Sequence, residues 1–220
     1  MSEVSDPIFA KIARRYDRIN AILSLGQERK WRRVGVRMLS SGTILDLGCG
    51  PGSTDFEGRT VIGLDPVPEM LALSPVAATV VAVGESIPLR DGSVDGVFSA
   101  FVFRNLTSVD ETLAEIERVL RPGKVAVVVD LGRPRNLVLR FLHRIGTAVV
   151  LPLVGLVFAG APGEYWYLHK TLDSLPQPEQ LYAGRGLEIE DIWRSGLFGF
   201  VYGVRLRKPR PALEEEPEAA

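Results

Sequence analysis

The chain contains 220 residues, of which 46% are hydrophobic and 24% charged, a composition typical of one globular domain with a sizeable core. Its 26 basic and 27 acidic residues give a net charge of -1, which excludes a strongly basic nucleic-acid binder on bulk charge. One cysteine, Cys49, excludes a disulfide scaffold, and with only two histidines we expect no metal site. The N-terminus lacks the apolar segment of a secretion signal, which favours a cytoplasmic protein.

The first 40 residues are expected to be helical. Asp6-Pro7 is a helix start, and an apolar stripe with Tyr16 continues from it to about residue 20. A second helix is expected over residues 27–40. We interpret residues 1–40 as an N-terminal helical lid on the domain that follows, residues 41–208.

The middle of the chain alternates between strands and helices. Near-continuous apolar runs, which are typical of parallel strands covered on both faces, lie at 43–48, 60–65, 79–83, 95–102 and 124–131. The clearest helix is 108–120, with a capping box formed by Ser108 and Glu111 and a stop at Pro122-Gly123. Residues 186–196 and 198–207 are expected to add an antiparallel edge. The pattern predicts an α/β fold with a doubly wound, mostly parallel, Rossmann-like sheet.

A glycine-rich turn directly follows the first predicted strand, at residues 48–52. Gly48 and Gly50 allow the backbone to turn tightly and to approach a ligand closely, although a plain strand-to-helix connection would also explain them. Asp65, at the end of the next strand, could accept hydrogen bonds from a ribose diol or could cap the helix begun at Pro66–Pro68. Asp46 could hold a ligand amine or bind the N–H groups of the loop. Because Asp65 follows Gly52 by 13 positions, the intervening helix has room for about one turn.

These motifs resemble a known family. ILDLGCGPG (44–52), Asp65 with PEML (68–71), and ERVLRPG (117–123) resemble class I S-adenosylmethionine-dependent methyltransferases. YDRINAILS (16–24), RNLT (104–107) and YWYL (165–168) more narrowly resemble the ubiquinone/menaquinone-biosynthesis C-methyltransferases. The resemblance spans about residues 6–205.

The resemblance implies a binding site for S-adenosyl-L-methionine and a set of residues around it. The implied cofactor-binding residues are Asp46, Gly48, Gly50, Asp65, Gly84, Glu85 and Ala100. Met70 either packs on the adenine or is plain core. The implied catalytic residues are Arg104 and Asn105 at the oxygens of the substrate ring and Tyr16 in the lid.

Each implied catalytic residue has a purely structural alternative. Arg104 and Asn105 could merely cap the helix that begins near Ser108, and Tyr16 could be amphipathic core. A guanidinium is always protonated, so Arg104 is expected to stabilise a phenolate or orient water and not to remove a proton. The base is left open between water and Asp130.

A basic, apolar segment marks the substrate side. Residues 131–163 contain no acidic residue, and Leu137, Val138, Phe141, Leu142 and Ile145 share one helical face. We interpret 133–180 as a substrate-facing insertion with a peripheral, lipid-contacting helix and an apolar tunnel for a polyprenyl tail. A cap over the sheet or a homodimer face would explain the same pattern. Residues 209–220 are expected to form a disordered acidic tail.

The leading hypothesis is an S-adenosylmethionine-dependent C-methyltransferase for a lipophilic quinol such as demethylmenaquinol, in quinone biosynthesis. It would work in the cytoplasm or peripherally on the inner face of the membrane. The alternatives are a methyltransferase for another small molecule, a nicotinamide dehydrogenase, and a non-catalytic cofactor-binding or membrane-docking module.

Overall fold

The computed structural model describes residue 21, residues 24–154, residue 172 and residues 176–210. Tyr16, the YWYL signature and most of the expected acidic tail lie outside the described residues. Residues 155–171 of the expected insertion also lie outside them.

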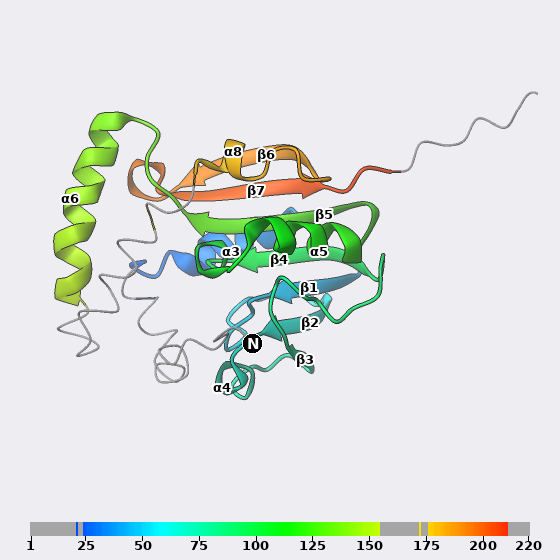
Figure 1. Cartoon of the computed structure of the whole chain (residues 1–220). Coiled ribbons are helices and arrows are strands. Elements are labelled where there is room, and N and C mark those ends of the chain that lie inside the picture. The colour runs from blue at the N-terminus through cyan, green and yellow to red at the C-terminus, as the bar shows by residue number, and fades with distance from the viewer. Residues whose placement is uncertain (1–20, 22–23, 155–171, 173–175, 211–220) are drawn as a thin grey trace, which may run out of the picture.

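A seven-stranded sheet in the order β3-β2-β1-β4-β5-β7-β6 forms the centre of the described fold (Figure 1). The strands are β1 (Thr43–Leu47), β2 (Thr60–Asp65), β3 (Ala78–Val81), β4 (Val94–Ala100), β5 (Leu120–Leu131), β6 (Glu188–Ser195) and β7 (Val201–Arg207). β1 to β5 pair in parallel, whereas β7 pairs antiparallel with both β5 and β6. The expected doubly wound sheet with an antiparallel edge is therefore confirmed.

Helices cover both faces of this sheet. They are α3 (Glu28–Arg37), α4 (Pro68–Leu71), α5 (Val109–Val119), α6 (Leu137–Val154) and α8 (Pro178–Leu181), with short 3-10 turns η2 (Phe103–Asn105) and η4 (Leu197–Gly199). α3 contacts β4 and β5 in a cluster with Phe98, Val127 and Val129. α5 packs with Ala126 and Val128 in a second cluster. Because consecutive side chains at the centre of β5 are buried on opposite faces, residues 125–129 are apolar at every position.

The connection from β1 to β2 corrects one expectation. Residues 48–59 contain turns and no helix, although the sequence suggested a helix of about one turn there. Phe56 from this connection packs edge-to-face on Phe98, with the ring centroids 5.6 Å apart. One aromatic side chain thus covers this part of the sheet in place of a helix.

α5 begins with the expected N-cap, but other contacts at its start and the position of its end differ from the expectation. The Ser108 hydroxyl accepts a hydrogen bond from the Glu111 amide at 3.2 Å, as an N-cap should. The amide of Ser108 itself donates to the carboxylate of Glu85 at 3.0 Å, so a residue distant in sequence replaces the expected reciprocal contact from Glu111. The helix ends at Val119, and Pro122-Gly123 lies inside β5 instead of terminating the helix.

α6 lies toward the edge of the sheet where the parallel strands end (Figure 1). As the sequence predicted, apolar side chains are exposed together on it: Leu137, Val138, Phe141, Leu142, Ile145 and Val149. Among the described residues, no helix is both long and apolar enough to cross a membrane.

Candidate active site

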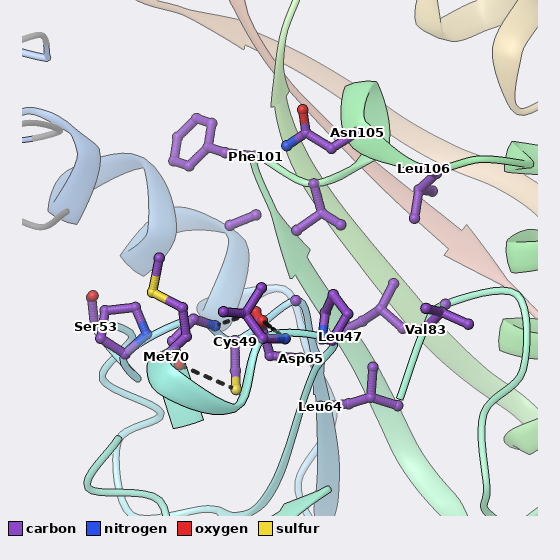
Figure 2. A pocket seen from close by; sticks show the side chains of 18 of the residues that line it. Leu47, Cys49, Ser53, Leu64, Asp65, Met70, Val83, Phe101, Asn105 and Leu106 are labelled. Carbon is purple, nitrogen blue, oxygen red and sulfur yellow. Dashed lines mark hydrogen bonds between the residues drawn. The ribbon is translucent and has the colours of Figure 1, made fainter. Parts of the chain in front are cut away.

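A cavity of about 210 Å³ opens at the carboxyl ends of β1, β2 and β4. β1 lies between β2 and β4, so the chain order reverses here, which is where open α/β sheets bind ligands. Phe101, Asn105 and Leu106 lie on one side of the cavity, and Ser53, Met70 and Asp65 lie on the other (Figure 2).

The glycine turn forms the floor of this cavity. Gly48 has φ +69°, and a Cβ there would lie 2.4 Å from a methyl group of Val102, so only glycine fits. Gly50 has φ +54° and its missing Cβ would meet nothing within 4 Å, which leaves open space for a ligand against the backbone. The amides of Gly48 and Cys49 donate to the Leu64 carbonyl, at 2.7 and 3.0 Å, and thereby fix the turn to β2.

Asp65 joins the glycine turn to the start of α4. One carboxylate oxygen accepts from the Gly50 amide and the other from the Val67 amide, each at 2.9 Å. Asp65 also lines the cavity. The same residue therefore fills both expected roles, since it caps the start of α4 and faces the space for a ligand. Burial raises the pKa of Asp65, and the two amide hydrogen bonds oppose that shift. Each oxygen keeps a further lone pair for a ligand hydroxyl.

Asp46 is buried inside β1 and is not among the residues that line the cavity. Its Oδ2 atom has no hydrogen-bond partner among the described residues. Burial raises its pKa to about 7, a rise that nearby Arg32 opposes and Asp65 reinforces. Cys49 is also buried, and burial raises the pKa of its thiol, so it stays protonated and is a poor nucleophile.

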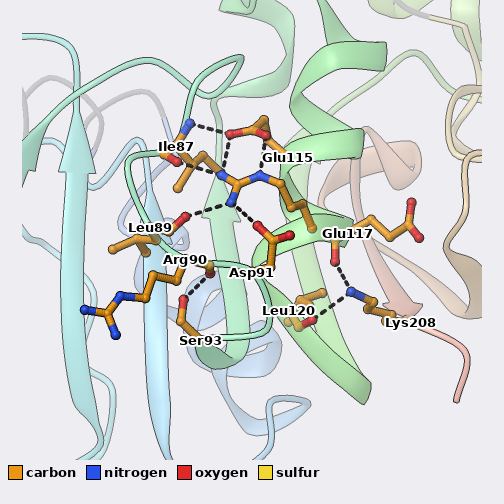
Figure 3. Close-up of polar contacts among 10 residues, drawn as sticks. Ile87, Leu89, Arg90, Asp91, Ser93, Glu115, Glu117, Leu120 and Lys208 are labelled. Carbon is orange, nitrogen blue, oxygen red and sulfur yellow. Dashed lines mark hydrogen bonds and ion pairs between the residues drawn. The ribbon is translucent and has the colours of Figure 1, made fainter. Parts of the chain in front are cut away.

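The loop between β3 and β4 forms a third wall, with Gly84 and Glu85 facing the cavity. The Glu85 carboxylate accepts hydrogen bonds from the amides of Thr107 and Ser108, at 2.7 and 3.0 Å. Arg118 of α5 anchors the same loop by donating to the carbonyls of Ile87 and Leu89, and its partners are drawn in Figure 3. Hydrogen bonds therefore attach this wall to α5 and to the residues just before it.

The segment after β4 supplies the fourth wall. Ala100, Phe101 and Asn105 line the cavity, and Asn105 is exposed at its rim. Phe101 has φ +67°, a left-handed conformation that is unfavourable for a bulky residue and that often marks a functional site.

Arg104 lies next to this wall but does not line the cavity. It donates from Nη1 to Asp130 at 2.8 Å, and Asp130 is fully buried. Asp130 also accepts from the amides of Phe103 and Leu131, so its carboxylate is surrounded by donors. Burial raises the pKa of Asp130, while Arg104 and the two amides lower it. The N-cap of α5 is Ser108, and Arg104 forms its ion pair with Asp130 instead of capping the helix.

Seven of the expected site residues converge on the cavity: Gly48, Gly50, Asp65, Gly84, Glu85, Ala100 and Asn105. Asp46 and Arg104 lie outside its lining, and Tyr16 lies outside the described residues. Sequence reasoning missed Arg32, which lines the cavity from α3 and is 7% exposed. Helical spacing could have found it, because Arg32 shares the buried face of α3 with Glu28, Gly35 and Val36.

The lining suits a nucleoside with a polar extension. Asp65 can accept from a diol, while Leu64, Met70 and Val83 offer apolar surface to a flat ring. The open backbone at Gly50 accommodates the extension. The described residues contain no group of three or more candidate metal ligands.

Comparison with known proteins agrees with this geometry. Residues 2–184 match the model of the ubiE/COQ5 methyltransferase family. The chain is 34% identical over 193 residues to a demethylmenaquinone methyltransferase of Thermus thermophilus, covering 80% of this chain and 88% of that protein. It is also 34% identical over 196 residues to a ubiquinone/menaquinone biosynthesis C-methyltransferase of Geotalea uraniireducens, covering 80% and 83%.

Solved structures share the fold of this chain. A solved S-adenosylmethionine-dependent methyltransferase of Thermotoga maritima superimposes with a TM-score of 0.61 at 16% identity, covering 91% of this chain and 98% of that one. Another from Methanosarcina mazei gives a TM-score of 0.57 at 17% identity, covering 81% and 98%.

Fold and site together define a class I methyltransferase. The chain belongs to the ubiE/COQ5 methyltransferase family.

Proposed function

We propose that this chain transfers a methyl group from S-adenosylmethionine to a ring carbon of a polyprenylated hydroquinone such as demethylmenaquinol. The observation that carries the proposal is the cavity in which Asp65 and the Gly48–Gly50 turn face an apolar wall. Relatives named as demethylmenaquinone methyltransferases support the identity of the ring.

The cofactor would lie along the cavity with its ribose at Asp65. The free lone pairs of that carboxylate would accept hydrogen bonds from the two ribose hydroxyls. Met70 and Val83 would contact the adenine, and Gly84, Glu85 and Ala100 would line the adenine and sulfonium side. When bound, S-adenosylmethionine supplies an electrophilic methyl group on a positively charged sulfur.

The substrate side needs an electron-rich ring carbon. A hydroquinone that loses a phenolic proton delocalises negative charge onto the adjacent carbon, whereas the oxidised quinone has no such proton. Asn105, at the rim, is placed to donate its side-chain amide to a ring oxygen. Arg104 lies next to Asn105 in the chain but outside the cavity lining, so its charge would stabilise a phenolate only at longer range. Since Asp130 is buried and already binds three donors, it positions Arg104 and leaves water as the proton acceptor.

The test is incubation with labelled S-adenosylmethionine and either reduced or oxidised demethylmenaquinone. We expect label in the reduced quinol alone, and strongly reduced turnover in Asn105→Ala. Binding of S-adenosylhomocysteine, followed in parallel, reports on the integrity of the cofactor site. If the protein binds this nucleoside yet methylates neither quinone, the substrate assignment is wrong.

We further propose that the apolar face of α6 docks onto an anionic membrane, where a polyprenylated substrate would reside. Six large apolar side chains are exposed on this face, and Phe141 is 64% exposed. The surrounding segment, 131–163, carries four arginines and no acidic residue, so its charge complements anionic headgroups.

Flotation with vesicles of phosphatidylcholine and phosphatidylglycerol tests this surface. We expect Phe141→Ser with Leu142→Ser to abolish flotation, and Arg140→Glu with Arg144→Glu to remove the preference for anionic vesicles. Val81→Ser, which changes an exposed apolar residue on the distant edge strand β3, serves as the control. Undiminished flotation of the serine variant would refute docking through α6. A dimer that the same variant dissociates, without flotation of the unmodified chain, would assign the face to a second copy.

A further inference from the structure

The loop between β6 and β7 exposes two large apolar side chains at its tip. Leu197 is 69% exposed and Phe198 is 46% exposed, and both belong to the 3-10 turn η4. Phe198 has φ +60° and ψ 15°, a left-handed conformation that is unfavourable for a bulky aromatic residue. Gly196 and Gly199, with φ +75° and +71°, flank the pair. Backbone strain and exposed apolar surface thus coincide at one tip, which indicates that the tip has a function.

This loop lies at the same edge of the sheet as the cavity. Val201, at the start of β7, pairs with Leu131 at the end of β5 and with Ser195 at the end of β6. Because β7 runs antiparallel to β5, the β6–β7 loop lies beyond the carboxyl ends of the parallel strands. The cavity opens at the ends of three of those strands, β1, β2 and β4. A surface that binds the tip would therefore lie on the cavity side of the sheet.

Aromatic contacts join the loop to α6. Phe200, directly after η4, stacks on the His143 ring of α6 with the ring centroids 5.4 Å apart. Trp31 of α3 packs edge-to-face on Phe200 at 5.9 Å and donates from Nε1 to the Ser195 hydroxyl at 3.0 Å. In Figure 1 the loop is the orange bend between β6 and β7 beside α6. The exposed tip and α6, with its exposed apolar side chains, are therefore neighbours.

The charge around the tip favours an anionic bilayer over a second copy of the chain. Residues 192–213 contain no acidic residue, as is also true of residues 131–163, which include most of α6. Glu179 of α8 lies near this surface, but it is paired with both Arg135 and Arg194. Two copies would place like charges opposite one another, which disfavours self-association. Anionic headgroups would instead attract the surface.

We propose that Leu197 and Phe198 enter an anionic phospholipid bilayer, so that the β6–β7 loop turns the cavity edge of the sheet toward the membrane. This inference rests on the proposed function and adds a second contact to the docking of α6. A single helix face leaves the molecule free to rotate about the helix axis, whereas contacts on two elements fix its orientation. The ring of a polyprenylated quinol would then reach the cavity while its tail stays in the bilayer.

A fluorophore at the tip tests insertion directly. Cys49 is buried and the pKa of its thiol is raised, so it reacts slowly, and Leu197→Cys supplies an accessible thiol. On vesicles of phosphatidylcholine and phosphatidylglycerol, an environment-sensitive dye at this position should shift to shorter wavelength. Nitroxides on the lipid acyl chains should quench it. The same dye at Leu73→Cys, an exposed position between α4 and β3, should show neither change.

Two results of this experiment would overturn the proposal. A dye at position 197 that stays in water, whether or not the protein floats with the vesicles, would show that the tip does not insert. A shift that appears without vesicles as the protein concentration rises would assign the tip to a second copy of the chain.

A paired substitution measures what the tip contributes. Leu197→Ser with Phe198→Asn removes the apolar surface and keeps the loop conformation, because asparagine tolerates positive φ. The partition onto anionic vesicles should weaken by at least about 10-fold, as loss of two inserted apolar side chains implies. Leu73→Ser with Val81→Ser changes two exposed apolar residues before and in β3, the opposite edge strand. This control should leave the partition unchanged.

Turnover separates the loop from the chemistry of the cavity. The tip variant should lose turnover of demethylmenaquinol embedded in vesicles, but its turnover of a short-chain quinol in detergent should stay within about twofold. Unchanged partition of the variant would refute the role of the loop. An equal loss with both substrates would refute it as well, since the tip would then act on the cavity. If the unmodified chain methylates neither quinol, the proposed function fails, whereas the dye still reports whether the loop inserts.

Discussion

The two sides of the cavity are held together by different kinds of interaction. On the β1–β2 side, backbone amides bind backbone carbonyls and the carboxylate of Asp65, within a stretch of about twenty residues. On the β4–β5 side, a side-chain ion pair between Arg104 and Asp130 joins elements 26 residues apart. The first arrangement is local and is built mainly from the main chain. The second depends on two buried charges that must be correctly paired.

This difference predicts which substitutions weaken ligand binding and which lower the stability of the fold. On the main-chain side a side-chain change should affect ligand binding more than folding, since most of the hydrogen bonds survive it. On the ion-pair side a change should affect folding directly.

The largest expected effect is on the ion-pair side, in Asp130→Ala. Removing this carboxylate leaves the Arg104 guanidinium and the amides of Phe103 and Leu131 without their buried acceptor. We expect the free energy of unfolding to fall by about 3–5 kcal/mol, measured by urea denaturation. Adding Arg104→Met should recover part of that loss. A loss of under about 1 kcal/mol in the single variant would show that the pair is not what joins these elements.

The second largest expected effect is the pH dependence that Asp46 gives to the stability of the fold. Burial raises its pKa from 3.8 to about 7. At pH values between these two, Asp46 is therefore protonated in the folded chain and ionised in the unfolded chain. Asp46 should therefore lower the stability of the ligand-free chain as pH rises from 3.8 through about 7. Relative to Asp46→Asn, the unmodified chain should lose up to about 4 kcal/mol on going from pH 4 to pH 8. Parallel stability curves for the two proteins would contradict this prediction.

Asp65→Ala should separate binding from folding on the main-chain side. We expect binding of S-adenosylhomocysteine to weaken by about 1–3 kcal/mol, because the ribose would lose its charged acceptor. Glu69→Ala, an exposed carboxylate on the adjoining α4, is the matched control and should leave affinity unchanged. If Asp65→Ala binds with unaltered affinity, the carboxylate serves only the Gly50 and Val67 amides.

The smallest expected effect is at the start of α5. Ser108→Ala removes the acceptor of the Glu111 amide and should cost about 1 kcal/mol in the free energy of unfolding. The Glu85 contact with the Ser108 amide survives this change, so the helix should keep its register. If Ser108→Ala lowered the free energy of unfolding as much as Asp130→Ala, losing the cap would also disrupt the β3–β4 wall of the cavity.

The sequence predicted the main-chain side well for a physical reason. Continuous apolar strands, the glycines at 48 and 50 and an acidic residue at the end of β2 all act through local backbone geometry, which leaves a local pattern. The missing helix between β1 and β2 was harder to predict, because the aromatic contact of Phe56 with Phe98 that replaces it joins distant positions.

The β4–β5 side of the cavity was harder to predict from the sequence, because its contacts also join residues that are distant in sequence. The family pattern singled out Arg104, but nothing near it in sequence reveals that Asp130 binds it away from the cavity lining. Arg32 looked like one more arginine in a basic segment, although its buried position on α3 follows from helical spacing. The Glu85 contact with α5 likewise depends on a fold that brings two loops together.

The attachment of the β3–β4 loop to α5 has a consequence for isotope exchange. The amides of Ile87, Thr107 and Ser108 all donate to carboxylates, those of Glu115 and Glu85. Such protons reach deuterated solvent only when the loop separates from the helix, so the three should exchange at one common rate. Their exchange would therefore report how often this wall of the cavity opens.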